Sequence, residues 1–333
     1  MKCVKVPLKQ LNDTRLKLME IGQMNMDYKI KAADDYGYIP LNGDVEGYEI
    51  VDIELEPMKK VPHNFSEILK DELTPEEIEN LRTSFDTIGD IVILEIPDDL
   101  LSKKQIIGEA ALKFTKKQAI YMKNSAIKGT IRIRDLEFLA GTDDSITIHK
   151  EHGVRLKLDV KEVYFSPRLA TERIRVSNSV KDGEKILDMF CGIGPFPILI
   201  AKNHDVDITA VDINEAAIKY LNENIKLNKL KGTVKTYCGD VRQVSESFNC
   251  KFDRIIMNLP GLAYTFLDVA VNLIEDGGII NYYEFSDSYE QGIKRLTHAV
   301  SKAGKEVEII NTRKVKSTSP GEWHVAIDGK VKG

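Results

Sequence analysis

The sequence lacks the features that would direct it to a membrane, an oxidising compartment or a metal ion. No apolar run reaches the length of a membrane span, and residues 1–5 (MKCVK) do not begin a long apolar leader. No cluster of histidine and cysteine has the spacing of a zinc site. The four cysteines form no CxxC pair, so we expect free thiols in a reducing compartment, the cytoplasm, and no bound metal. These cysteines are Cys3, Cys191, Cys238 and Cys250.

The overall charge does not favour a nucleic-acid partner, because the 333 residues carry a net charge of −5. Hydrophobic residues make up 42% and charged residues 30%, a mixture typical of folded globular proteins. Residues 101–134 depart from this average, with nine basic residues against the single acid Glu109, a local charge of about +8. Such a segment is a candidate phosphate-binding surface, but a solvated lysine face explains the charge equally well. The basic residues are Lys103, Lys104, Lys113, Lys116, Lys117, Lys123, Lys128, Arg132 and Arg134.

Breaks in the pattern divide the chain into three regions. Residues 1–58 alternate short helical and strand patterns and end in a segment with two prolines. Residues 66–163 predict an α+β domain, in which Thr74 caps a helix that begins at Pro75. Residues 164–333 form the third region. The strands expected in the second region cover residues 88–96, 129–134, 145–149, 154–160 and 162–165.

The third region predicts an α/β fold, because strand and helix patterns alternate regularly. This rhythm is typical of a doubly wound parallel sheet. Ligands of such sheets bind at the carboxyl ends of the strands, so the residues after each strand are the first candidates for a site. The strands are expected at residues 185–190, 206–212, 232–238, 252–258 and 278–283.

The loop after the first of these strands reads DMFCGIGPF (residues 188–196). Its glycines allow a tight turn where the backbone approaches a ligand closely. A nicotinamide-binding GxGxxG fingerprint is a rival interpretation, but Pro197 occupies the third glycine position and Asp188 is extra to that motif. A carboxylate at this point suits the cationic amino-acid end of S-adenosylmethionine, which has no pyrophosphate to bind at a helix N-terminus.

Acidic or amide residues also follow the next three strands. Asp212 ends the second strand, where it can accept both ribose hydroxyls, and Asp240 follows the third, where it can receive the adenine amino group. Asn258 ends the fourth. Each residue alone is more often a turn former or a helix cap than a ligand. Four of them at successive strand ends favour a class I, Rossmann-like methyltransferase domain that binds S-adenosylmethionine.

The sequence Asn-Leu-Pro (residues 258–260) narrows the acceptor, because it is a variant of the Asn/Asp-Pro-Pro-aromatic loop of enzymes that methylate planar nitrogens. Methylation of cytosine C5 is disfavoured, since Gly261 stands after Pro260 where a cysteine nucleophile would be needed. Guanine N1 as acceptor would need a carboxylate base and a cationic donor for O6. Residues 164–173 (YFSPRLATER) offer Glu172 beside basic residues, although an exposed helix N-terminal turn also explains this acid.

Several segments resemble those of the archaeal tRNA (guanine-37 N1)-methyltransferases. They are RDLEFLAG (134–141), TIHKEHG (147–153), YFSPRLATER (164–173), DMFCGIGPF (188–196) and MNLP (257–260). The similarity covers most of residues 85–333 and is weaker in the first 60. It implies two smaller α+β domains before the methyltransferase domain: residues 1–58 would contact the outer corner of tRNA, and the other two domains would grip the anticodon stem-loop. The implied partner is tRNA with G37, and we expect a monomer.

The resemblance also implies roles for individual residues. Glu172 is the expected general base, Arg132 binds O6 of the guanine, Asn258 orients the base, and Arg168 holds the flipped nucleotide or its phosphate. A base in an anticodon loop can be splayed out into such a pocket. The expected cofactor-binding residues are Arg173, Asp188, Phe190, Gly192, Asp212, Ile213, Asp240, Val241, Asn258 and Pro260.

Other functions stay open at this point. Some relatives methylate carbon 7 of a wyosine precursor at the same tRNA position, but the intact glycine loop and Asn-Leu-Pro favour guanine N1. A methyltransferase with a small-molecule or protein substrate would not need residues 101–134. A nicotinamide dehydrogenase and a non-catalytic RNA-binding module are the remaining alternatives, and the acids at the strand ends argue against the second.

Overall fold

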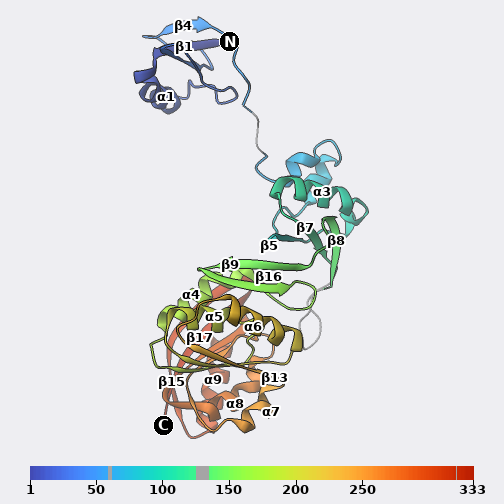
Figure 1. The fold of residues 1–333 in the computed structure, drawn as a ribbon, viewed down its shortest axis with the longest axis vertical. Coiled ribbons are helices and arrows are strands. Elements are labelled where there is room, and N and C mark those ends of the chain that lie inside the picture. The colour runs from blue at the N-terminus through green and yellow to red at the C-terminus, as the bar shows by residue number, and fades with distance from the viewer. Residues whose placement is uncertain (59–61, 125–134, 320) are drawn as a thin grey trace. The chain divides into compact units, whose positions relative to one another are not determined.

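The computed structural model describes residues 1–58, 62–124, 135–319 and 321–333 (Figure 1). It divides the chain into two compact units, Met1–His63 and Asn64–Gly333. Each unit has its own hydrophobic core. No helix in the described ranges is long and apolar enough to cross a membrane.

The first unit is a four-stranded antiparallel sheet in the order β2-β3-β1-β4, with one longer helix packed against it. Alternation along β1 brings Val4 and Val6 to the same face, where they pack with Leu18 of α1 and Ile39 of β3. The elements are β1 (Lys2–Pro7), η1 (Leu8–Gln10), α1 (Leu11–Glu20), β2 (Lys31–Ala33), β3 (Tyr36–Pro40) and β4 (Glu49–Asp52).

The second unit begins with a small mixed sheet in the order β5-β6-β7-β8, on which α3 packs. The predicted helix start at Thr74 is confirmed: its hydroxyl accepts the N–H of Glu77, whose side chain accepts the N–H of Thr74 in return. The elements are η2 (Phe65–Leu69), α2 (Pro75–Asn80), β5 (Asp86–Ile88), β6 (Ile91–Leu94), η3 (Asp98–Lys103), α3 (Lys104–Thr115), β7 (Ala119–Lys123) and β8 (Leu136–Gly141).

Two of the strands expected in this region differ from the structure. The strand expected at residues 88–96 is confirmed only as the shorter β6, because Gly89 has φ +57° and turns the chain between β5 and β6, which pair as antiparallel strands. Residues 162–165 form no strand, and the N–H of Val163 instead bonds to the carbonyl of Asp159 in a turn. The strand expected at residues 129–134 lies outside the described residues.

The C-terminal half of the second unit is a seven-stranded sheet in the order β13-β12-β11-β14-β15-β17-β16. The strands from β13 to β15 are parallel, and β17 runs antiparallel between β15 and β16. The predicted α/β fold is therefore confirmed. Successive strands are added on one side of β11 as far as β13, and the chain then crosses to the other side of β11 to form β14. The elements are β11 (Lys185–Asp188), α5 (Pro195–Asn203), β12 (Asp207–Asp212), α6 (Glu215–Leu227), β13 (Thr233–Cys238), α7 (Val241–Val244), η5 (Ser245–Ser247), β14 (Phe252–Met257), η6 (Ala263–Phe266), α8 (Leu267–Leu273), β15 (Ile274–Ser286), α9 (Glu290–Lys302), β16 (Glu306–Ser319) and β17 (Glu322–Lys332).

Along the chain, a hairpin and a helix connect the small sheet to the large sheet of this unit. The hairpin consists of β9 (Ile146–Glu151) and β10 (Val154–Asp159) and packs on α6. The buried amide of Asn224 on α6 bonds to the N–H of Lys157 at 2.7 Å and to the carbonyls of Lys157 and Ile193 at 3.1 Å. These bonds fix the hairpin to the loop after β11. The chain then passes through η4 (Pro167–Leu169) into α4 (Ala170–Ser179).

Candidate active site

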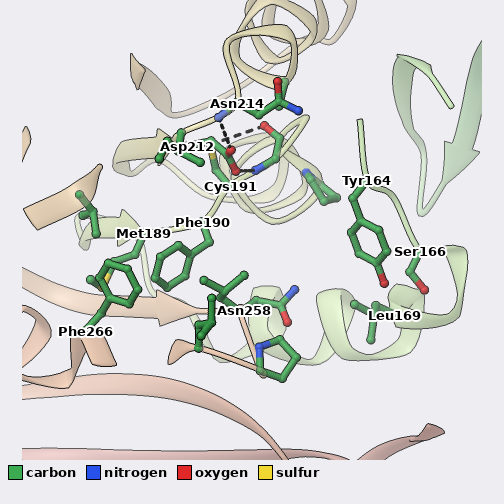
Figure 2. A pocket seen from close by; sticks show the side chains of 18 of the residues that line it. Tyr164, Ser166, Leu169, Met189, Phe190, Cys191, Asp212, Asn214, Asn258 and Phe266 are labelled. Carbon is green, nitrogen blue, oxygen red and sulfur yellow. Dashed lines mark hydrogen bonds between the residues drawn. The ribbon is translucent and has the colours of Figure 1, made fainter. Parts of the chain in front are cut away.

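A cavity of about 170 Å³ opens at the carboxyl ends of β11, β12, β13 and β14, the edge that the sequence predicted (Figure 2). Apolar side chains form much of its wall, among them Met189, Phe190 and Phe266, and polar groups enter at a few points. This distribution is typical of a small-molecule or cofactor site. The predicted site residues that line the cavity are Arg173, Phe190, Gly192, Asp212, Ile213, Asp240, Val241, Asn258 and Pro260.

The loop after β11 approaches the cavity with its backbone. Gly192 has φ +53° and Gly194 has φ +86°, a region that side chains rarely adopt. A Cβ at Gly194 would lie 2.2 Å from Cδ1 of Leu221, so close packing on α6 also requires glycine there. The N–H of Gly192 donates to the Asp212 carboxylate at 2.7 Å. The turn is therefore locked to the next strand of the sheet.

Asp188 ends β11 but does not line the cavity. Its side chain is 1% exposed, and Oδ1 accepts the N–H of Phe190 at 3.3 Å, while Oδ2 has no hydrogen-bond partner among the described residues. Burial raises the pKa of Asp188 to about 8, and the nearby carboxylate of Asp212 adds to the effect. A buried carboxyl with an unused oxygen suits a cationic ligand group, because a positive charge would favour its ionised form.

Asp212 ends β12 and does line the cavity. Its Oδ1 accepts the N–H of Asn214 at 2.9 Å, in addition to the bond from Gly192 to Oδ2 (Figure 2). Burial raises the pKa of Asp212, and these backbone N–H groups act in the opposite direction. The carboxylate is thus fixed in one orientation at the strand end, as a group that accepts ribose hydroxyls must be.

Asp240 and Arg242 form the wall after β13. Asp240 caps α7 by accepting the N–H of Arg242 at 2.9 Å, and its carboxylate also pairs with the Arg242 side chain. The hydrogen bond from this side chain lowers the pKa of Asp240. The Arg242 guanidinium lies 4.7 Å from the centre of the Phe266 ring. This pair gives the cavity a flat, partly polar wall beside the apolar ring.

Asn258 follows β14 and points into the cavity between Phe190 and Leu169 (Figure 2). Its Oδ1 is buried and has no hydrogen-bond partner among the described residues. Such an acceptor costs free energy unless a ligand supplies a donor. This amide is therefore the clearest sign that the cavity is built for a polar ligand.

Arg173 on α4 reaches the cavity from the opposite wall and is 1% exposed. Its Nε and Nη2 each lie 2.5 Å from a carboxylate oxygen of Glu151, at the end of β9. Nη2 also donates to the carbonyl of Ser166 at 3.1 Å, and the guanidinium lies 5.1 Å from the centre of the Phe165 ring. The position of this charge is thus determined by the hairpin and by the segment before α4.

Glu172 and Arg168 lie outside the cavity lining. Glu172 is 1% exposed and accepts hydrogen bonds from Arg175 at 2.7 Å and from the hydroxyl of Tyr283 at 2.7 Å. The alternative explanation of an exposed N-terminal turn is therefore wrong for this residue. Arg168 donates from Nε to Asp86 of β5 at 2.6 Å, and its side chain is 52% exposed. Arg132 lies outside the described residues.

The structure lowers the charge that the basic segment presents. Four of its lysines are paired with acids from other parts of the second unit, an effect that a count along residues 101–134 cannot include. Because the acid in each pair neutralises its lysine, the excess of positive charge in the described part of the segment is smaller than the sequence count of +8 indicates. The pairs are Lys103–Glu77, Lys104–Glu137, Lys117–Asp90 and Lys123–Asp86.

Three residues from the last strands also line the cavity, and the sequence did not suggest them. They are Phe285 of β15, Lys316 of β16 and His324 of β17. No motif marks these positions. Phe285 reaches the site because β15 pairs with β14, and Lys316 and His324 reach it because β17 and β16 continue the sheet as antiparallel strands. Tyr164 and Ser166 were also not assigned, although they lie within the YFSPRLATER segment that signalled this wall.

The strand order and the cavity together define a class I S-adenosylmethionine-dependent methyltransferase. The residues present fit the cofactor: Asp212 and Asp240 stand at successive strand ends, and Phe190 supplies an apolar face. When bound, S-adenosylmethionine supplies an electrophilic methyl group on a sulfonium. Within the described residues, no group of three or more histidine, cysteine or acidic side chains could hold a metal ion.

Comparison with known proteins agrees with this class. Residues 147–310 match the model of the TRM5/TYW2 methyltransferase domain, residues 65–144 that of the TYW2 N-terminal domain, and residues 3–49 that of the tRNA methyltransferase 5 N-terminal domain. The chain is 44% identical to tRNA (guanine(37)-N(1))-methyltransferase Trm5b of Pyrococcus abyssi, over 98% of both chains. This protein belongs to the TRM5/TYW2 methyltransferase family.

Two further comparisons bear on the acceptor. The crystal structure of Trm5b from Pyrococcus abyssi superimposes with a TM-score of 0.86 over 100% of both chains, at 43% identity, and a complex of aTrm5 with tRNALeu with 0.84 over 99% of both, at 38% identity. A tRNA(Phe) (4-demethylwyosine(37)-C(7)) aminocarboxypropyltransferase of Pyrococcus horikoshii is 32% identical over 80% of this chain and 95% of its own. The family thus contains enzymes that transfer different groups.

Proposed function

We propose that this protein transfers the methyl group of S-adenosylmethionine to N1 of guanine 37 in tRNA and acts as a monomer. The observation that carries the proposal is the buried, unpartnered Oδ1 of Asn258 in the cavity. The Watson–Crick edge of guanine offers N–H donors at N1 and N2, which suit an acceptor of this kind. The relatives named tRNA (guanine(37)-N(1))-methyltransferase, which match over nearly the whole chain, support the same acceptor.

The general base in this proposal is Glu172. Methyl transfer to guanine N1 requires removal of a proton, and a carboxylate is a suitable acceptor. Arg175 and Tyr283 donate hydrogen bonds to Glu172 and hold its carboxylate in place. Because these bonds occupy lone pairs of the carboxylate, Glu172 must exchange at least one of them when it accepts the proton. Arg168, which is half exposed in η4, would hold the flipped nucleotide or its phosphate.

We further propose a division of work among three domains. Residues 1–58 would contact the outer corner of tRNA, and residues 66–163 would bind its backbone through the basic segment. Arg132 in that segment would stabilise the negative charge that develops on O6 of guanine. Residues 164–333 would bind the cofactor and perform the transfer. The resemblance of the RDLEFLAG and YFSPRLATER segments supports this assignment.

One experiment tests acceptor and atom together. Radiolabelled methyl transfer from S-adenosylmethionine is measured on a tRNA transcript with G37 and on a matched A37 transcript, followed by nucleoside analysis. We expect 1-methylguanosine from the first transcript and no label in the second. Equal labelling of both, or a different methylated nucleoside, would exclude the proposal. Glu172→Gln should retain tRNA binding and lose single-turnover rate, and an unchanged rate would remove Glu172 as the base.

The aminocarboxypropyltransferase relatives suggest the alternative substrate, a tRNA that carries 4-demethylwyosine at position 37. A transcript with this nucleoside, incubated with cofactor labelled separately in the methyl group and in the aminocarboxypropyl group, distinguishes the activities. We expect neither label to be incorporated. Incorporation of the methyl label would favour C7 methylation of the wyosine precursor, whereas the aminocarboxypropyl label would indicate the other transfer.

A further inference from the structure

A buried group of charged and amide side chains lies outside the cavity lining, around the carboxylate of Glu172. The Arg175 guanidinium bridges two carboxylates: Nη2 lies 2.7 Å from Oε1 of Glu172, and Nη1 lies 2.6 Å from Oδ2 of Asp328. Asp328 belongs to β17 and is 4% exposed. Two acids, one on the helix and one on the sheet, therefore share a single cation.

Asp328 is held firmly by the strands on both sides of it. Asn281 of β15 and Asn311 of β16 are its cross-strand neighbours, and their amide groups donate to its two oxygens at 2.7 Å and 3.0 Å. An irregularity in β16 between Ile309 and Asn311 brings Asn311 opposite Asp328. These neutral donors hold the carboxylate of Asp328 in one orientation without adding positive charge.

The orientation of Asn281 is fixed from the far side. Its Oδ1 accepts a hydrogen bond from Arg254 at 3.2 Å, which leaves the NH₂ group to face Asp328. Arg254 in turn pairs with Glu184 at 2.8 Å. The chain of contacts therefore runs from Glu184 before β11 to Asp328, with each donor and acceptor assigned.

We propose that Asp328 is a positioning residue for Glu172, which it orients and tunes by sharing the guanidinium of Arg175. The inference rests on the proposed role of Glu172 as general base. If Arg175 served Glu172 alone, its full charge would oppose protonation of that carboxylate. The negative charge of Asp328 partly cancels the positive charge of Arg175. Glu172 is therefore a stronger base than it would be beside Arg175 alone, and it keeps the same position.

The charged and polar groups around Glu172 support the sharing of Arg175 between Glu172 and Asp328. Arg175 lies on its own helix, Tyr283 of β15 donates at 2.7 Å, and Arg313 of β16 lies 3.5 Å away. His324 of β17 lies behind Tyr283, with ring centres 5.3 Å apart. With both acids ionised, the two arginines and two carboxylates balance, and a proton on Glu172 leaves one positive charge. Without Asp328, protonation of Glu172 would leave two positive charges instead of one.

Two variants test the proposal because they should act in opposite directions. Asp328→Asn leaves the Arg175 charge to Glu172 and makes it a weaker base. The acid limb of the single-turnover rate profile should then move about one pH unit lower. The plateau should fall roughly three- to tenfold. Arg175→Gln removes the cation and should move the limb to higher pH. Dissociation constants for S-adenosylmethionine and tRNA should stay within about twofold of those of the unaltered enzyme in both variants.

Asp276→Asn is the matched control, because Asp276 is exposed on β15 and the chemical change is the same. Its rate profile should match that of the unaltered enzyme. The proposal is overturned if the acid limb of the rate profile stays in place, or if it moves in the same direction in both variants. Asp328 and Arg175 would then have a packing role alone. If Asp328→Asn fails to fold, Arg175→Gln alone still decides, since an unmoved limb there also overturns it. Failure of the proposed base is distinguishable, because Glu172→Gln would then keep full activity.

Discussion

Arg173 and Glu151 form a buried bidentate ion pair that joins α4 to the end of β9, with both N–O distances at 2.5 Å. Arg173 also lines the cavity, so the pair connects the hairpin to the cofactor site. The Glu151 carboxylate faces His149 as well, whose Nδ1 accepts the N–H of Gly89 in the turn between β5 and β6. The proton on that ring therefore belongs on Nε2, toward Glu151. The small sheet and the cavity are linked by one continuous set of contacts.

The first prediction concerns Glu151→Gln. This change leaves the buried Arg173 guanidinium without a counter-charge, and we expect the free energy of unfolding to fall by about 3–5 kcal/mol. The affinity for S-adenosylmethionine should fall with it, because Arg173 loses its fixed position. Urea denaturation and calorimetry measure the two effects. Glu137→Gln is the control: it breaks a pair with Lys104 in which both side chains are 32% exposed, and should cost less than about 1 kcal/mol. Equal losses in the two variants would contradict the assignment.

The same pair predicts a dependence of stability on pH. Burial alone would raise the pKa of Glu151, but hydrogen bonds from His149 and Arg173 outweigh it and lower the pKa to about 2. A carboxyl with a depressed pKa stabilises the fold fully above its ordinary value of 4.5, and this contribution is lost as the pH falls toward 2. The difference in unfolding free energy between the unaltered protein and Glu151→Gln should therefore shrink below pH 4.5. A constant difference down to pH 3 would speak against the ion pair as its source.

Much of the fold was predictable from the sequence, since the central strands β11, β12 and β14 contain buried apolar residues and are followed by short polar loops. The prediction was wrong where one residue changed the path of the chain. Gly89 lies inside a run of β-forming residues, yet its φ of +57° makes a turn, and a Cβ there would lie 2.2 Å from Oγ1 of Thr147. This packing depends on a hairpin almost 60 residues away, so no local pattern could reveal it.

The third prediction concerns Asn258, whose Oδ1 has no hydrogen-bond partner in the part of the chain that the structure describes. Asn258→Ala removes the acceptor that we assign to the guanine edge, and we expect the single-turnover rate to fall about 10²-fold, with tRNA affinity nearly unchanged. Asn222→Ala is a matched control on the exposed face of α6, where the amide oxygen accepts a hydrogen bond from the Thr236 hydroxyl. It should keep the full rate. A rate loss in Asn222→Ala of the same size, or a loss in Asn258→Ala confined to cofactor binding, would contradict the role.

The site was predictable where it follows strand ends and unpredictable where it depends on partners. Asp212, Asp240 and Asn258 were found because the carboxyl ends of parallel strands meet at one edge. Lys316 and His324 belong to antiparallel strands that carry no motif, so only the sheet order brings them to the cavity. Sequence reasoning also could not show that Glu172 is buried, because Tyr283 and Arg313, two of its partners, come from the distant strands β15 and β16.

The last prediction concerns Asp188, whose buried carboxyl has a pKa raised to about 8. A raised pKa means that ionisation opposes folding, so the unaltered protein should lose stability as the pH rises from the ordinary value of 3.8 toward 8. Asp188→Asn removes this dependence. The variant should match the unaltered protein near pH 4 and exceed it by a few kcal/mol near pH 8.

The same substitution separates a binding role from a packing role. If the unused Oδ2 of Asp188 favours the cationic end of S-adenosylmethionine, Asp188→Asn should bind the cofactor at least tenfold more weakly while being more stable. Calorimetry at pH 8, together with urea denaturation at pH 4 and pH 8, measures both quantities on one preparation. Retained affinity would assign the carboxyl to the fold alone. Lower stability at pH 8 would show that the carboxyl has a partner that offsets its burial.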